Sequence, residues 1–370
     1  MQQSSVSEPA SESASALASE PALLRQRWQA LRQSQPRTRA RDAADQLGVS
    51  EAQLLATGVG EDAVRLDLRF DVLLPRLESL GRVMSLTRNA HAVHEKRGTW
   101  RNVELHGLRA LVLDEDIDLR LFLSRWRFGF ALREHLADGL RRSLQFFDAT
   151  GTAVHKVFLE DPGGAAAFDA LVEELRHVDQ VQLLPVERAS PVAPPRPDGE
   201  VDVEGLRAGW LALKDTHDFF PLLQRLGVAR TQALRLVGRE LATPVAPESL
   251  AWVLERVAAS GLSIMVFVGN PGVIQIHTGP VRTVRPTGPW LNVLDPGFNL
   301  HVRADNIQAA WVVRKTTRDG VVTSLELFDA AGENIALVFG QRKPGHPELP
   351  AWQTLMRELT EALSVPEAQP

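Results

Sequence analysis

The chain of 370 residues contains no cysteine and no tyrosine. Without cysteine it can form no disulfide, thiolate zinc site, iron–sulfur cluster or cysteine nucleophile. Without tyrosine it offers no phenolate ligand, so phenylalanine and tryptophan must supply the aromatic contacts. Histidine, methionine, lysine and carboxylate side chains remain as metal ligands. A reducing compartment, most simply the cytoplasm, agrees with this composition.

The chain also lacks an excess of positive charge and a long apolar run. Its 41 Lys and Arg and 46 Asp and Glu give a formal net charge of −5, so we expect no nucleic-acid partner. No uncharged apolar stretch approaches the roughly 18 residues of a membrane helix, and we expect no membrane insertion. Residues 1–22 are rich in Ser, Glu, Ala and Pro, and we expect a disordered N-terminal arm there rather than a secretory signal.

An internal repeat is the strongest pattern in the sequence. Residues 143–151 (SLQFFDATG) match residues 324–332 (SLELFDAAG), and Asn89 matches Asn270 at the same spacing. The pairs 28–31 (WQAL) with 210–213 (WLAL), and 47–49 with 226–228 (both LGV), keep the same order. This period is far longer than that of a solenoid or propeller, so it predicts a duplicated domain. We expect an N-terminal repeat at 23–185, a proline-rich linker at 186–203 and a C-terminal repeat at 204–370.

Each repeat is predicted to be helical at first and then to form strands. Apolar residues recur every three or four positions in residues 43–55, 225–237 and 247–259, which favours helices. Short β-rich runs separated by Gly, Asn and Asp follow in both copies, and DATG and DAAG are typical of turns between paired strands. We therefore predict an α+β fold with an internal duplication and two large antiparallel sheets, expected to stack.

Two positions change their chemistry between the repeats. His217 lies seven residues after Trp210, whereas Gln35 lies seven residues after Trp28, so the fold alone does not require imidazole there. Arg120 is a charge in an otherwise apolar strand, and its repeat partner is His301. His217 could still be an ordinary surface or hydrogen-bonded histidine, and Arg120 an ordinary ion-paired arginine.

Many ordered blocks of the sequence carry a resemblance to a known family. They are 87–89 (TRN), 93–95 (VHE), 118–123 (DLRLFL), His217 with 219–220 (FF), 267–270 (FVGN), 314–315 (RK), 323–328 (TSLELF) and 340–342 (GQR). With them the chain resembles the HemS/HmuS/ChuS family of bacterial cytoplasmic hemin-binding and hemin-degrading proteins. The match covers nearly the whole chain after the N-terminal arm. The family is itself an internal duplication, and the resemblance implies haem between the two halves.

The resemblance implies a haem b cofactor with His217 as the proximal iron ligand and Arg120 as the distal, catalytic residue. Imidazole suits haem iron, whereas a guanidinium donates hydrogen bonds and does not ligate. The haem propionates would contact three cations, Arg230, Lys315 and Arg342. The porphyrin would face three aromatic side chains, Phe122, Phe267 and Phe339. Phe339 stands where relatives are expected to have tyrosine, so a hydroxyl contact to the haem edge is missing. Each cation could instead form an ordinary ion pair.

Other motifs are weak. His91 and His94 lack a third metal ligand, and residues 114–118 (DEDID) lack the glycine of a calcium loop. Gly58 and Gly60 follow a helical pattern, whereas the glycines of a Rossmann dinucleotide-binding motif follow a strand. Three functions remain: an enzyme that opens the porphyrin ring with an unidentified electron donor, a carrier, or a structural module without cofactor. A carrier would take haem from an inner-membrane importer to a separate haem oxygenase. We predict haem handling in iron acquisition, with degradation slightly ahead of trafficking and the oligomeric state open.

Overall fold

The protein is described from a computed structural model, which covers residues 10–137, 139–190, 193–343 and 345–366. Within these residues no helix is both long and apolar enough to cross a membrane. The chain divides into two compact units that do not coincide with the sequence repeats. Unit 1 contains residues 1–85, 103–110 and 121–190, whereas unit 2 contains residues 86–102, 111–120 and 191–370.

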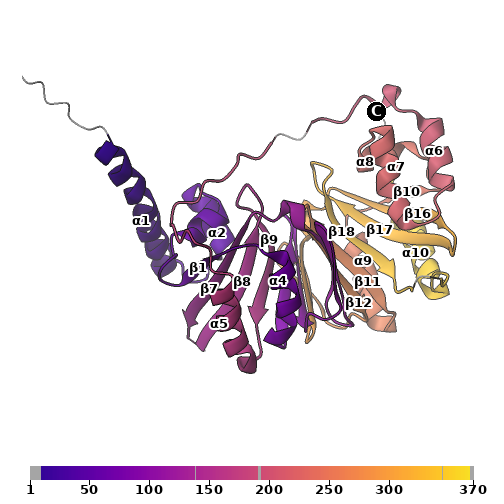
Figure 1. The fold of residues 1–370 in the computed structure, drawn as a ribbon. Coiled ribbons are helices and arrows are strands. Elements are labelled where there is room, and N and C mark those ends of the chain that lie inside the picture. The colour runs from indigo at the N-terminus through magenta and orange to yellow at the C-terminus, as the bar shows by residue number, and fades with distance from the viewer. Residues whose placement is uncertain (1–9, 138, 191–192, 344, 367–370) are drawn as a thin grey trace, which may run out of the picture. The chain divides into compact units, whose positions relative to one another are not determined.

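In its described residues, unit 1 combines an antiparallel sheet with five α-helices. The helices are α1 (Ala10–Ser34), α2 (Ala40–Leu47), α3 (Glu51–Ala56), α4 (Phe70–Arg76) and α5 (Ala165–Glu174). The strands that lie wholly within the unit are β1 (Ala63–Leu66), β4 (Val103–His106), β7 (Phe128–Leu136), β8 (Gly139–Phe147) and β9 (Ala153–Leu159). β1, β7, β8 and β9 pair in that order, and α4 and α5 lie side by side next to this sheet (Figure 1).

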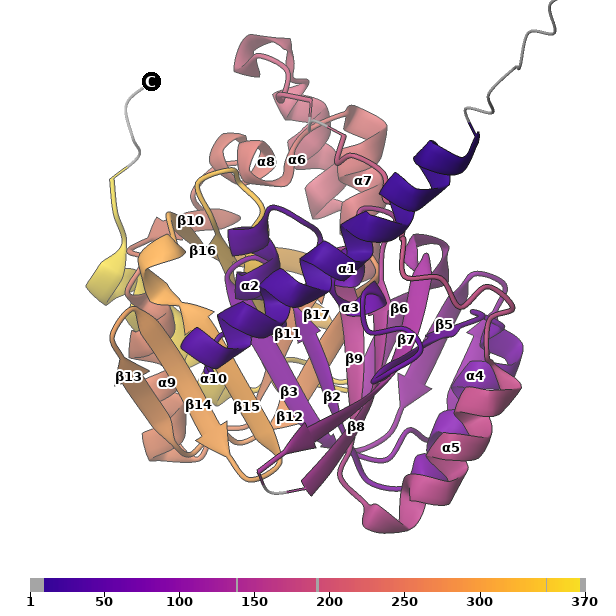
Figure 2. The ribbon, with the colours of Figure 1, turned by 90° about the vertical axis from the view of Figure 1, so that its left-hand side faces the viewer.

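Unit 2 holds two antiparallel groups of strands. One group has the order β10 (Ala242–Val245), β16 (Ala309–Thr317), β17 (Gly320–Phe328), β18 (Asn334–Gly340), β11 (Ile264–Asn270) and β12 (Val273–Gly279). The other has the order β3 (Ala92–Gly98), β15 (Phe298–Arg303), β14 (Trp290–Asp295) and β13 (Val284–Thr287), as Figure 2 shows. Three further strands have residues in both units: β2 (Val83–Arg88), β5 (Arg109–Leu113) and β6 (Asp118–Phe122).

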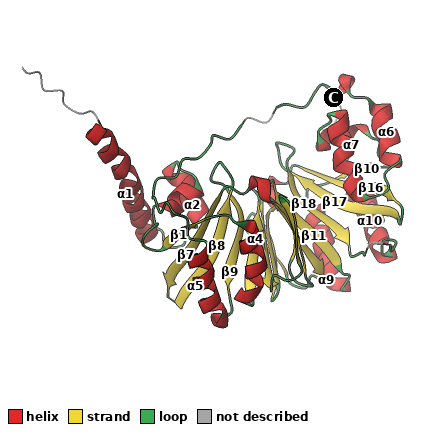
Figure 3. Cartoon of the chain, viewed as in Figure 1, coloured by secondary structure: helices red, strands yellow, loops and turns green. Residues whose placement is uncertain are grey.

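Five helices complete unit 2. They are α6 (Val203–Leu211), α7 (Phe219–Leu226), α8 (Arg230–Leu236), α9 (Ser249–Ser260) and α10 (Pro350–Leu363). α9 and α10 share a core with both groups of strands, because Val257 and Leu359 belong to the same buried cluster as Val266 and Leu300. α6, α7 and α8 form a second cluster beside β10 and β16 (Figure 3). The alternation of buried and half-buried residues in the strands is that of sheets with one face on a core. The structure confirms the α+β class.

The predicted long helices at 43–55 and 225–237 are each divided in two. Gly48 ends α2 and Gly227 ends α7, both with left-handed backbone conformations (φ 70° and 61°) that glycine adopts without a steric penalty. The same break therefore occurs at the same place in both repeats. The apolar periodicity of the sequence continues across both glycines, so the sequence analysis did not predict the break. The helix predicted at 247–259 is present as α9.

The chain ends and the linker differ in detail from the predicted segments. The first nine residues of the expected arm lie outside the described residues, and from Ala10 the chain is helical as α1. Two residues of the predicted linker, 191 and 192, also lie outside the described residues, and the described part is extended before a short turn at Asp198–Glu200. α5 and α10 follow the strands of the repeats, where no helix was predicted.

Candidate functional site

His217 lies in a single 3-10 turn, Thr216–Asp218, immediately before α7. The Asp215 carboxylate accepts the backbone N–H of His217 at 2.8 Å and contacts the Nδ1 atom of its ring at 2.5 Å. A carboxylate can only accept, so Nδ1 carries a proton, and in the neutral ring Nε2 has the lone pair. The side chain of His217 is 90% exposed. The structure thus presents the Nε2 atom of His217 at the surface of unit 2.

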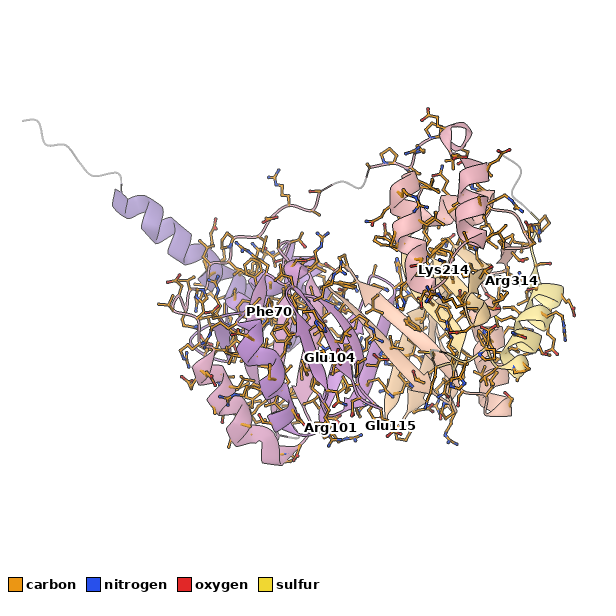
Figure 4. All side chains as sticks on the ribbon, turned by 45° about the vertical axis from the view of Figure 1, so that its right-hand side comes forward. Phe70, Arg101, Glu104, Glu115, Lys214 and Arg314 are labelled. Atoms are coloured by element: carbon orange, nitrogen blue, oxygen red, sulfur yellow. The ribbon has the colours of Figure 1, made fainter. Side chains whose placement is uncertain are left out.

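The turn that carries His217 is fastened to the neighbouring strand. Asp218 accepts the backbone N–H groups of Lys214 and Asp215, and the Trp210 indole donates to the Arg314 carbonyl at 2.8 Å. The Arg318 N–H donates to the carbonyl of Lys214 at 3.0 Å. Figure 4 labels Lys214, which precedes the turn, and Arg314, which lies on β16. These hydrogen bonds to β16 and to Arg318 just after it hold the backbone that leads into the turn of His217.

Arg342 brings a cation close to the same turn. The backbone N–H of His217 lowers the pKa of Asp215, the His217 side chain adds to this, and the charge of Arg342 lowers it further. The guanidinium of Arg342 contacts Asp319 at 3.5 Å, and its Nε is buried without a hydrogen-bond partner among the described residues. Asp215 therefore stays ionised, and Arg342 keeps a donor available.

Arg230 and Lys315 meet on one buried carboxylate, Glu326. Arg230 binds Glu326 through two hydrogen bonds of 2.8 Å, and Lys315 Nζ donates to it at 2.7 Å. Both cations also lie over the ring of Phe219, at 5.1 and 4.6 Å from its centroid. Burial alone would raise the pKa of Glu326, but the two cations hold it at about 2. Two positive charges face one negative charge, so this cluster has a net charge of +1.

An aromatic surface continues from this cluster across the sheet. Phe339 on β18 and Phe267 on β11 pack edge to face, with ring centroids 5.1 Å apart. Register places both on one face, because Met265 pairs with Phe339 and Phe267 pairs with Leu337. Glu326 pairs with Leu337 and so shares that face. The opposite face of these strands is buried in the core, whereas Phe267 and Phe339 are only half-buried.

Arg120 lies on β6, which follows β12 in the strand order. Its guanidinium forms an ion pair with Asp118 and donates to the Leu119 carbonyl at 3.3 Å. Burial of Asp118 raises the pKa of this carboxyl, although Arg120 opposes the change. The side chain of Arg120 remains 32% exposed. Phe122, half-buried at the end of the same strand, belongs to unit 1.

The structure joins the predicted residues into three groups. The first contains His217 and Arg342, the second Arg230 and Lys315, and the third Phe267 and Phe339. Arg120 contacts Asp118 and Leu119 instead, and Phe122 lies at the end of the same strand. The sequence analysis missed Asp215 and Glu326, which organise the first two groups. Glu326 carried a usable signal, because the equivalent residue of the first repeat is Gln145.

The weak motifs have structural explanations. His91 contacts Asp329 at 3.2 Å, and His94 is buried beside Phe298, so the two imidazoles make separate packing contacts. In the part of the chain that the structure describes, no three His, Cys, Asp or Glu side chains are grouped as metal ligands. Residues 114–117 form a turn that leads into β6, in which the Asp114 N–H donates to the Ile117 carbonyl at 3.0 Å.

Comparisons with known proteins define the class. The family model of the haemin-degrading HemS.ChuX domain matches the chain twice, at residues 48–175 and 227–359. The hemin transport protein HmuS of Yersinia pestis is 40% identical over 341 residues, 91% of this chain and 97% of that protein. The chain is thus a tandem of two such domains, which confirms the predicted duplication.

Solved structures agree with this classification. The heme-binding protein PhuS from Pseudomonas aeruginosa, in its holo form, is 49% identical, with a TM-score of 0.90 over 92% of this chain and 99% of that one. ChuS, an Escherichia coli heme oxygenase, is 40% identical with a TM-score of 0.81 over 91% and 99%. The chain belongs to the HemS/HmuS/ChuS family.

Proposed function

We propose that the protein binds haem b and that His217 is the axial ligand of the iron. The observation that carries this proposal is the Asp215–His217 pair, which leaves Nε2 directed away from its carboxylate partner. A carboxylate on the other ring nitrogen is the usual companion of a metal-ligating histidine, because it fixes the tautomer and raises the basicity of the ligand. Membership of a family whose relatives are named for hemin and heme supports the same assignment.

The surroundings of His217 suit a flat, apolar ligand with an anionic edge. Phe267 and Phe339 provide a half-buried aromatic surface of the kind that packs on a porphyrin. Arg342 has an uncommitted Nε donor, and we assign it to a propionate. Arg230 and Lys315 are held by Glu326, so their contribution is the positive charge that this carboxylate leaves uncompensated. Phe122 is proposed to contact the porphyrin from unit 1.

Arg120 is proposed to be the distal residue. Asp118 and the Leu119 carbonyl engage its Nη1 atom, and the 32% exposure of the side chain leaves the guanidinium accessible for further hydrogen bonds. A guanidinium stays protonated at any physiological pH and can therefore donate to an oxygen ligand without itself binding the iron. Bound haem would supply the redox chemistry of ring opening. The residues of this chain would position that group, exclude water and donate hydrogen bonds.

We favour oxidative degradation that releases iron in the cytoplasm of a bacterium, with an electron donor still to be identified. The alternative is a carrier that receives haem from an inner-membrane importer and passes it to a separate oxygenase. The exposed position of His217 favours this alternative, because a ligand on a surface turn can be exchanged. One relative is named a hemin transport protein and another a heme oxygenase, which reflects the same division.

A single-turnover assay separates the two functions. The haem-loaded protein is mixed with ascorbate in air, in the presence of catalase to remove free peroxide, and products are followed by absorbance and mass spectrometry. Degradation predicts a ring-opened product that is formed at least tenfold more slowly in Arg120→Gln, with Arg125→Gln as the matched control. Intact haem, followed by rapid transfer to apomyoglobin, would instead establish the carrier.

A further inference from the structure

Unit 1 contains a pocket that the proposed haem site does not use. It has a volume of about 660 Å³ and lies where β1, α4 and the start of β7 meet the segment that leaves the unit. Every lining residue belongs to unit 1, including Phe70, which is labelled in Figure 4. Pockets of about 300–1,000 Å³ are the usual size for small ligands.

The outer wall of the pocket is a fastened segment, residues 182–187. Gln53 donates to the Leu184 carbonyl at 3.3 Å, Gln182 donates to the Val59 carbonyl at 3.1 Å, and the Glu187 N–H donates to the Ala149 carbonyl at 2.8 Å. Leu184 is buried in the unit 1 core beside the partly buried Val186. The wall is therefore built into the fold, and the pocket is preformed.

The walls combine aromatic rings with positive charge. Phe70 and Trp126 pack edge to face with ring centroids 6.1 Å apart, and Phe128 lies beside them in the lining. Of these rings Phe70 is half-buried, and Trp126 and Phe128 are buried. Arg65 and Arg127 also line the pocket, and neither side chain has an ion-pair partner among the described residues. Guanidinium groups without an ion-pair partner beside an aromatic wall are suited to an anion that carries a flat ring.

His177 adds a directed donor. The Asp179 backbone N–H donates to Nδ1 of His177 at 2.9 Å, so Nδ1 is an acceptor and the proton of the neutral ring lies on Nε2. The carboxylates in the lining are Asp67, which has Arg69 at 3.9 Å, and Glu187, which is exposed at the rim. The lining thus contains three side chains that can donate N–H groups, two carboxylates and an aromatic wall.

We propose that this pocket binds a small aromatic anion, namely a planar ring that carries one carboxylate or phosphate group. The site is separate from the residues assigned to haem, and its occupancy does not depend on that assignment. Arg65 and Arg127 bind the anionic group, His177 donates a hydrogen bond to it, and Phe70 and Trp126 contact the ring. A nucleotide and an aromatic carboxylic acid share this chemistry, and the test distinguishes them.

Isothermal titration of the full-length protein tests the proposal with two probes, AMP and 2-naphthoate. Their uncharged counterparts, adenosine and 2-naphthamide, serve as ligand controls. We expect one-to-one binding of at least one anionic probe and at least tenfold weaker binding of its neutral counterpart, because each ion pair in a pocket contributes about a factor of ten or more. The probe that binds more tightly identifies phosphate or carboxylate as the preferred group.

Variants locate the binding. Arg65→Gln and Arg127→Gln should each weaken the anionic probe about tenfold, whereas Arg125→Gln, a neighbouring arginine outside the lining, should leave it unchanged. His217→Ala should also leave it unchanged, which separates this proposal from the haem proposal. Thermal melts confirm that each variant is folded. Failure of both anionic probes to saturate the wild-type protein, or binding that both pocket variants retain, would overturn the proposal.

Discussion

Asn89 and Asn270 form the same hydrogen bond in opposite directions. The Asn89 side chain donates to the Gly269 carbonyl at 3.2 Å, and the Asn270 side chain donates to the Arg88 carbonyl at 2.9 Å. Each asparagine is the repeat equivalent of the other, as Gly269 is of Arg88. The two hydrogen bonds are therefore related by the duplication. In each of them a side chain of one repeat donates to a backbone carbonyl of the other repeat. The presence of Asn at both positions of the repeat has a structural cause.

Removal of one of these side chains should destabilise the fold. Asn89→Ala leaves the Gly269 and Ile335 carbonyls and the Ala92 N–H without their partner, and an unpaired buried polar group costs about 1–3 kcal/mol. We expect a loss of about 2 kcal/mol in the free energy of unfolding, measured by urea denaturation. Asn299→Ala, which removes one side-chain contact to Glu95, should cost less. Equal losses in the two variants would contradict this account.

Asp215 should control the affinity for hemin without contacting it. Loss of a carboxylate that orients a metal-ligating histidine weakens metal affinity about 10–100-fold. We expect this loss in Asp215→Ala and a smaller one in Asp215→Asn, whose amide oxygen still accepts from Nδ1. Competition with apomyoglobin measures both. Asp305→Ala, which removes an exposed pair with Arg303, is the matched control. Undiminished affinity in Asp215→Ala would show that the carboxylate does not position the ligand.

Glu326 should be the most sensitive charged residue of unit 2. Glu326→Gln leaves Lys315 buried and Arg230 partly buried without a counter-charge, and breaking a buried ion pair costs about 3–5 kcal/mol. Thermal unfolding should therefore shift to lower temperature by far more than in Glu61→Gln, which removes a partner of Arg25 from an exposed position. Similar midpoints for the two variants would indicate that the cluster is not a buried ion pair.

The buried histidines of unit 2 should make the fold sensitive to acid. Burial, with the nearby Lys96 charge, lowers the pKa of His277 to about 3, and burial lowers that of His94 well below 6.5. Below pH 6.5 the unfolded chain binds protons that the folded chain does not, so the free energy of unfolding falls as the pH decreases from about 6.5 towards 3.

His94→Gln tests this dependence, because glutamine occupies the equivalent position 275 of the second repeat. The slope of the free energy of unfolding between pH 6 and 4 should decrease, by at most the contribution of one bound proton. His106→Gln, at an exposed side chain, should leave the slope unchanged. An unaltered slope in His94→Gln would mean that this imidazole titrates normally in the fold.

The sequence predicted the features that follow from repetition and periodicity and missed those that depend on a single glycine or on a side-chain partner. The duplication followed from the match between the two repeats, and the α+β class and α9 from patterns within each repeat. The division of α2 from α3 at Gly48 did not, because the apolar periodicity continues through the glycine. Asp215 and Glu326 escaped notice because their importance lies in partners: Asp215 acts through His217, and Glu326 joins Arg230 to Lys315 across 96 and 11 positions of the chain.

The central claim is that His217 ligates haem iron, and a hemin titration tests it most directly. Wild-type protein, His217→Ala and the exposed-site control His106→Ala are titrated with hemin and followed in the Soret and visible bands. We predict a saturable one-to-one band in the wild type and the control that is lost or shifted in His217→Ala. An unchanged band in His217→Ala would contradict the assignment of the ligand, and the absence of any saturable band in the wild type would contradict haem binding itself.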